Sequence, residues 1–205
     1  MKKKGERVNG DKGRYFKTDS GELCVILSDG LGTGTDAAKE STVVVDLLEK
    51  FLRSGVSPSA AMKILNSVML LKNRESWGYA TIDLMCVDLF SGEACFYKYG
   101  AAPSYVKTSH GIRKIKCDNL CAGMGSGEQN APDVVRMMLR AGNIAVIASD
   151  GVTAGKTDEE MKELIDANAQ ADMKDLARQV LLSAQQEGEQ SDDMTVLAVR
   201  LEERA

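Results

Sequence analysis

Two apolar segments of this chain end in the same three residues. "VILSDG" covers residues 25–30 and "IAVIASDG" covers residues 144–151. Short apolar runs rich in Val and Ile are typical of buried β-strands. Each strand therefore brings one carboxylate, Asp29 or Asp150, to the edge of a sheet, where a glycine-containing loop follows. Two such endings in one chain of 205 residues predict that both aspartates serve one site.

Three more aspartates lie at boundaries between elements: Asp11 in "NGDKG", and Asp192 and Asp193 in "SDDMTV". Any one of these aspartates is explained equally well as a turn or cap residue. Carboxylates that converge in a poorly hydrated site repel one another and take up protons unless cations neutralise them. Carboxylate oxygens are hard ligands that suit Mg²⁺ or Mn²⁺. The set therefore predicts a divalent-metal site.

Length, charge and cysteine content limit the remaining classes of function. A chain of 205 residues suits a single domain, residues 1–205, with a substantial core of its own. A net charge of -4 and a pI near 5.2 argue against a nucleic-acid partner. No apolar stretch approaches the roughly 20 residues that span a bilayer, so we expect no membrane contact by this segment. An odd set of five cysteines indicates a reducing, cytoplasmic setting.

A zinc site is not expected. Cys117 and Cys121 have the spacing of a metal-binding pair, but no second cysteine pair follows, and His110 is the only histidine. Structural zinc sites usually need four such ligands. We expect His110 to be exposed in a turn beside a glycine.

The order of the elements predicts an α+β fold. Long runs of strands that alternate with helix pairs favour a layered sandwich over a doubly wound parallel sheet. Hydrophobic periodicity and turn residues predict strands at 14–18, 22–28, 79–89, 93–100, 104–108, 111–116, 134–140, 144–149 and 194–201. The same signals predict helices at 35–53, 57–71, 158–168 and 172–187.

Five segments, taken in order, resemble a known family. They are "SDGLGTGTDAAKES", "LLEKFLRSGVSPSAAMKILNSVMLL", "ATIDLMCVDL", "GAAPSYVK" and "DDMTVLAVRL". This series resembles the metal-dependent serine/threonine phosphatases of type 2C, also called the PPM family. It is most similar to a bacterial branch, the C-terminal phosphatase domains of stage II sporulation protein E. The resemblance implies a four-layer αββα sandwich of two antiparallel sheets flanked by helix pairs, in the C-terminal part of a longer protein.

The resemblance also implies a site with two Mn²⁺ or Mg²⁺ ions. Asp29 would bridge both ions and the Gly30 carbonyl would bind one of them. Asp150 and Asp192 would complete the coordination of the first ion, and Asp11 would help to hold the second. Asp29, Asp150 and Asp192 would thus be catalytic through metal-activated water. Neighbouring residues of a strand point to opposite faces, so the choice between Asp192 and Asp193 as ligand stays open.

In the implied reaction, a metal-bridging water attacks the phosphorus of a phosphoserine in line, with no covalent enzyme intermediate. This chain has Leu31 where many eukaryotic relatives have a histidine that protonates the leaving oxygen, so its general acid is open. Arg7 is a candidate phosphate contact, with a solvated terminal arginine as the competing interpretation.

The resemblance implies a substrate and a mode of regulation as well. Relatives act on a phosphorylated anti-sigma-factor antagonist in sporulation control, and they belong to membrane-anchored proteins with a cytoplasmic phosphatase domain. The helices from Thr35 to Leu71 would be a regulatory switch that completes the metal site, and a homodimer could form through them.

Two other functions compete with the enzymatic one. A catalytically inactive type-2C-like interaction domain would keep the sandwich and lose a metal ion. A nucleotide-binding protein could use "GLGTG" as its phosphate loop, but the Gly-Lys-Ser/Thr ending of such loops is absent. Outside these motifs, Asp83 and Asp88 should face opposite sides of one strand, each as a cap or a surface partner.

Overall fold

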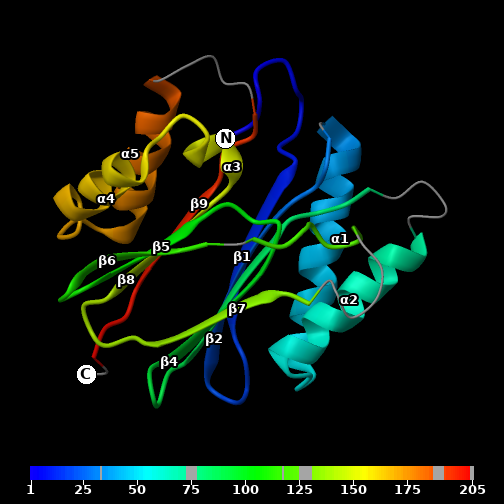
Figure 1. Ribbon diagram of the computed structural model, residues 1–205, viewed down its shortest axis with the longest axis horizontal. Coiled ribbons are helices and arrows are strands. Elements are labelled where there is room, and N and C mark those ends of the chain that lie inside the picture. Colours follow the sequence, from blue (N-terminus) through cyan, green and yellow to red (C-terminus); the bar gives the residue numbers. More distant parts are fainter. Residues whose placement is uncertain (33, 73–77, 117, 125–130, 187–191, 204–205) are drawn as a thin grey trace.

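The chain folds into four layers (Figure 1). The computed structural model describes residues 1–32, 34–72, 78–116, 118–124, 131–186 and 192–203. Two antiparallel sheets pack face to face, and helices cover the outer face of each. The predicted α+β class and its αββα sandwich are therefore confirmed.

The first sheet has five strands in the order β1-β2-β3-β4-β7. Its central strands are buried on both faces, which explains their nearly continuous apolar sequences. The strands are β1 (Asp11–Lys17), β2 (Glu22–Asp29), β3 (Ile82–Asp88), β4 (Glu93–Tyr99) and β7 (Asp133–Met138).

The second sheet has four strands in the order β6-β5-β8-β9. Strand β8 lies between β5 and β9, and each of its residues is buried. The strands are β5 (Ser104–Thr108), β6 (Gly111–Ile115), β8 (Ile144–Ala148) and β9 (Val196–Arg200).

The first helix pair, α1 (Gly34–Arg53) and α2 (Pro58–Lys72), packs against the first sheet. The second pair, α4 (Asp158–Ala167) and α5 (Met173–Gln186), packs against the second sheet. A capping box at Thr157 satisfies the first amide groups of α4. None of the described helices has the length and apolar character that a membrane crossing requires.

The core between the two sheets is apolar over most of its extent. We call it the inter-sheet core. Alternate residues of the central strands point into it, as the two-residue period of a strand requires. It contains Val25, Leu27, Met85, Val87, Ala94, Phe96, Val106, Ile115, Leu139, Ala145 and Ile147.

Most element positions agree with the sequence-based expectations, and the differences lie at the ends of strands. Strand β1 begins at Asp11, three residues before the predicted start, because those residues pair with the end of β2. The short helix α3 (Asp150–Thr153) was not predicted. Two residues named in the sequence-based expectations lie outside the described part of the chain: Cys117, of the pair judged unable to form a zinc site, and Glu187, the expected end of the last helix.

The turn after β4 depends on a glycine. Gly100 has a φ of +56°, in the left-handed region, which costs other residues about 1–2 kcal/mol. A side chain there would also clash with Cys121, because its Cβ would lie 2.8 Å from the Cys121 amide nitrogen. Gly100 and the two residues that follow it, Ala101 and Ala102, line the pocket described below.

We predict that Gly100→Ala destabilises the protein more than Gly55→Ala does. Gly55 also has a positive φ, of +83°, but a Cβ at this position would have no atom within 4 Å. Gly55→Ala should therefore lose only about 1 kcal/mol, whereas Gly100→Ala adds a steric clash. Urea unfolding of both variants tests the difference. Equal losses would show that the close contact with Cys121 relaxes without strain.

Candidate metal centre

Asp11 and Asp29 face each other across two neighbouring strands. Asp11 is the first residue of β1, Asp29 is the last residue of β2, and the antiparallel register pairs them directly. Asp11 is only 8% exposed, and neither of its carboxylate oxygens has a hydrogen-bond partner of normal geometry among the described residues. A buried carboxylate without partners is unfavourable unless a cation compensates it.

The backbone at Asp29 and Gly30 is held from two sides. The Asp29 amide donates to Thr81 Oγ1 at 3.0 Å, and the Thr81 amide donates to the Asp29 carbonyl at 2.9 Å. Helix α1 closes the other side, because a Cβ on Gly30 would collide with the Ala37 carbonyl and lie 2.8 Å from its Cα. Glycine is therefore required where the chain leaves β2.

The second sheet supplies the other carboxylates. Asp150 directly follows β8 as the first residue of α3, and Asp192 lies shortly before β9, the antiparallel partner of β8. Two hydrogen bonds between Ser149 and Thr195 extend this pairing toward the site. A Cβ on Gly151 would lie 3.3 Å from the Asp192 Cβ, so the two segments are in close contact.

The charges of these groups act on one another. The pKa of Asp29 is raised to about 8, mainly by burial and further by the carboxylates of Asp11, Asp150 and Asp192. Burial also raises the pKa of Asp11 above its ordinary value, although the nearby Ser149 and Thr195 hydroxyls oppose the rise. The pKa of Asp150 is raised by partial burial and by Asp192. The structure thus brings together aspartates that lie up to 181 residues apart in the chain.

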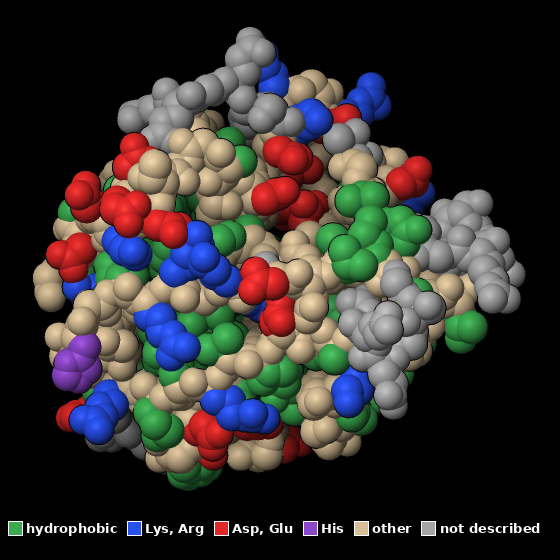
Figure 2. Space-filling view, viewed as in Figure 1, with side chains coloured by type: hydrophobic (Ala, Val, Ile, Leu, Met, Phe, Trp, Pro, Cys, Tyr) green, Lys and Arg blue, Asp and Glu red, His purple; other side chains and the backbone are tan. Residues whose placement is uncertain are grey.

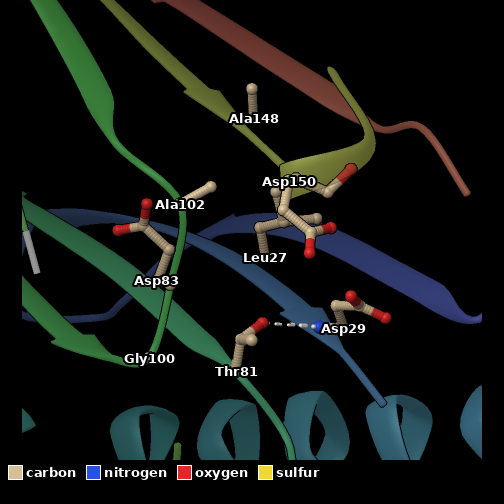
Figure 3. A pocket seen from close by; sticks show the side chains of 10 residues that line it. Leu27, Asp29, Thr81, Asp83, Gly100, Ala102, Ala148 and Asp150 are labelled. Carbon is tan, nitrogen blue, oxygen red and sulfur yellow. Dashed lines mark hydrogen bonds between the residues drawn. The ribbon is translucent and has the colours of Figure 1, made fainter. Parts of the chain in front are cut away.

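Asp29 and Asp150 line a pocket that is partly open at the protein surface. Figure 2 shows acidic side chains gathered there, beside α3 and the adjacent ends of β1 and α1. This pocket is small, with a cavity volume of about 20 Å³, and it extends inward from Asp29 and Asp150. In Figure 3 these two side chains lie on one side of the pocket, and Asp83 lies on the other.

The Asp193 carboxylate accepts hydrogen bonds from two backbone amides. Its Oδ1 accepts the Lys3 amide at 2.7 Å, and its Oδ2 accepts the Gly10 amide at 2.6 Å. Asp193 is 3% exposed and therefore anchors the segment that carries Asp11. Asp192 accepts one hydrogen bond from the Asp193 amide, at 2.8 Å, through Oδ1. This arrangement favours Asp192 over Asp193 as a ligand.

The donor set suits a hard divalent cation. Oxygen ligands, a raised carboxyl pKa and an unpartnered buried carboxylate are the features expected of such a site. As the side chains stand, no group of three acidic, histidine or cysteine side chains in the described part of the chain is arranged to hold an ion. Magnesium and manganese retain several waters and often bind through one or two carboxylates, so the residues fit these ions.

Several residues around the site have roles that differ from those expected from the sequence. Neither Thr81 nor Ser149 was given a role, although each fixes the backbone beside a candidate ligand. The prediction for Asp83 was wrong: it is 1% exposed inside the protein, neither a cap nor a surface partner. Asp88 does cap a turn, because its Oδ1 accepts hydrogen bonds from the Phe90 and Ser91 amides. Arg7 is exposed and makes no hydrogen bond or ion pair with other described residues.

Comparison with known proteins identifies the family. The family model of stage II sporulation protein E (SpoIIE) matches residues 19–202. Stage II sporulation protein E of Bacillus subtilis is 30% identical over 208 residues, which cover 98% of this chain and 25% of that protein. The protein of the same name from Priestia megaterium is also 30% identical, with 98% and 35% covered. The chain thus spans about a quarter to a third of these relatives.

Solved structures agree. A solved structure from Bacillus subtilis contains the PP2C phosphatase domain of SpoIIE and a fragment of its regulatory domain. It superposes on this chain with a TM-score of 0.87 and is 30% identical in sequence. The match covers 98% of this chain and 61% of that chain. The structure of a serine/threonine phosphatase from S. agalactiae has a TM-score of 0.81, and the match covers 98% of this chain and 97% of that one. Because the two sequences are only 14% identical, this match shows the shared fold alone. The chain belongs to the stage II sporulation protein E family and corresponds to its PP2C-type phosphatase domain.

Proposed function

We propose that this chain is a metal-dependent protein serine/threonine phosphatase that hydrolyses a phosphoserine. The observation that carries the proposal is the convergence of aspartates from both sheets, which raises the pKa of Asp29 to about 8. Such a site is poised to release protons and take up cations. Membership of a phosphatase-domain family supports the same reaction.

Two Mn²⁺ or Mg²⁺ ions are the cofactors we propose. Bound here, they would supply activation of water and neutralisation of the phosphate charge. Asp29 would contact both ions, and the Gly30 carbonyl would bind one of them. Asp150 and Asp192 would hold the first ion, and Asp11 would help to hold the second. Rigid strand ends suit this role because their backbone is fixed by pairing.

The remaining residues of the site orient these ligands and the substrate. Thr81 fixes the Asp29 backbone, and Asp193 fixes the loop before Asp11. Arg7 leads into that loop from the N-terminal segment and is the side chain we propose for a contact with the substrate phosphate. Leu31 is 54% exposed beside the site and offers no proton, so the leaving oxygen takes its proton from another group.

The substrate we propose is a phosphorylated anti-sigma-factor antagonist. The resemblance of the chain to sporulation phosphatases supports this choice, and an acidic pocket partly open at the surface is compatible with a serine presented on a protein surface. A cytoplasmic location, with a membrane anchor elsewhere in a longer protein, belongs to the same proposal.

Helices α1 and α2 are the regulatory element we propose. The Ala37 backbone of α1 touches Gly30, and a Cβ on Gly10 would lie 3.2 Å from the Ala37 Cβ. A shift of α1 would therefore reach the backbone of two candidate ligand turns directly. Exposed apolar residues of α2, Ile64 at 42% and Leu71 at 72%, support a homodimer through these helices.

Asp150→Ala should abolish the proposed activity. We expect hydrolysis of an aryl phosphate and a phosphoserine peptide with Mn²⁺ to fall by about a hundredfold or more, because a candidate ligand is removed. Asp166→Asn, which changes an exposed carboxylate on α4, is the matched control and should retain full activity. A folded parent chain that shows no Mn²⁺-dependent hydrolysis would instead support the inactive interaction domain.

Substitution of the two neighbouring aspartates should separate binding from anchoring. Asp192→Ala should weaken Mn²⁺ binding, measured by calorimetry, with little change in the melting temperature of the metal-free protein. Asp193→Ala should lower that melting temperature, because two backbone amides lose their acceptor. The reverse pattern would make Asp193 the ligand.

The stability of the metal-free protein should fall as the pH rises. Asp29 has a pKa of about 8 in the folded state against an ordinary value of 3.8, so between these values the folded chain binds more protons than the unfolded chain. The free energy of unfolding then decreases with increasing pH. In a chelator, we expect the melting temperature to drop by about 10 °C between about pH 5 and pH 8. Saturating Mn²⁺ should remove most of this decrease.

Asp29→Asn is the control for the assignment of this pH dependence. The amide does not titrate, so the variant should lose most of the decrease in chelator. If parent and variant respond equally to pH, other groups cause the effect.

A further inference from the structure

Three polar side chains interrupt the inter-sheet core. Asp83 of β3, Lys98 of β4 and Ser104 of β5 are each 0–1% exposed. We call them the inter-sheet polar cluster. They belong to the same strand faces as Met85, Phe96 and Val106, which lie two residues away and pack in the inter-sheet core.

The cluster joins the two sheets by directional bonds. Asp83 and Lys98 are opposite each other in the register of β3 and β4, and the Lys98 ammonium pairs with Asp83 Oδ2. Lys98 Nζ also donates to Ser104 Oγ at 2.8 Å. The Ser104 hydroxyl in turn donates to Asp83 Oδ2. One strand of the second sheet is thereby bonded to two strands of the first.

A buried charged pair is a poor way to stabilise a core. Removing both charges from water offsets most of their attraction, and apolar replacements of similar volume are often neutral or stabilising. Apolar contacts, however, have little directional preference, whereas hydrogen bonds restrict distance and angle. The cluster is thus better suited to fixing the relative position of the sheets than to holding them together.

The cluster lies directly behind the candidate metal centre. Asp83 lines the same pocket as Asp29 and Asp150 and sits on its inner side (Figure 3). It pairs across the strands with Leu27, two residues before Asp29. Ser104 begins β5, which pairs with β8, the strand that leads to Asp150. Each end of the cluster is therefore one strand away from a different half of the site.

We infer that Asp83, Lys98 and Ser104 are positioning residues that set the separation between the carboxylates supplied by the first sheet and those supplied by the second. The inference rests on the proposed metal centre, because only a site shared between two sheets requires their relative position to be fixed. None of the three residues needs to touch the ions or the substrate.

The test replaces the cluster by apolar residues of similar size. The triple variant Asp83→Leu/Lys98→Met/Ser104→Ala should melt, in chelator, at the same temperature as the parent or higher. Its affinity for Mn²⁺, measured by calorimetry, should fall about tenfold or more, as it does when groups that orient metal ligands are lost. Met85→Leu, a volume-conserving change elsewhere in the inter-sheet core, is the matched control and should leave affinity unchanged.

Two variants at position 104 keep the test decisive if the triple variant does not fold. Ser104→Ala retains the Asp83–Lys98 pair and removes the link to the second sheet, so it should weaken Mn²⁺ binding. Ser104→Thr keeps the hydroxyl and should restore the affinity toward that of the parent.

Equal Mn²⁺ affinity in the parent, the triple variant and Ser104→Ala would overturn the inference and leave the metal centre intact. An affinity loss that follows the melting temperature across all variants, Met85→Leu included, would also overturn it, because it would indicate a general loss of stability. Failure of the parent chain itself to bind Mn²⁺ would remove the metal centre and, with it, the inference.

Discussion

Repulsion between carboxylates at the common end of two sheets is the constraint on which the rest of this structure depends. Asp29 lies opposite Asp11 and senses the charges of Asp150 and Asp192, and its own burial raises its pKa most. Flexible loops would let such groups separate. Here strand pairing and close glycine contacts hold them in place, so the repulsion has to be relieved by protons or cations.

Much of this arrangement could be predicted from local sequence. The strands before Asp29 and Asp150 are short apolar runs with sharp polar endings, and both signals lie within about ten residues. Helices α1, α4 and α5 have strong apolar periodicity, so their existence was also predictable. The pairing of the Ser-Asp-Gly endings at one site needed a further step, supplied by the chemistry of carboxylates and by the resemblance to a phosphatase family.

The residues that escaped prediction depend on contacts far apart in sequence. Lys98 continues the buried face of Ala94 and Phe96, so the two-residue period does indicate that it points inward. Its partners could not be inferred, because the register of β3 against β4 and the facing of β5 are set by the whole fold. The same holds for Asp193. Its carboxylate accepts a hydrogen bond from the Gly10 amide, which lies 183 residues earlier in the sequence.

The unfavourable features of the molecule are concentrated at one end of the sandwich. Like charges lie on the outer side of the pocket, and a buried ion pair lies on its inner side. The rest of the inter-sheet core is apolar and well buried, which offsets both. A sequence selected for stability alone has no reason to place polar groups there. Their shared location supports the proposal that they serve one task, with the carboxylates as candidate ligands and the inter-sheet polar cluster as the group that keeps the two sheets in register.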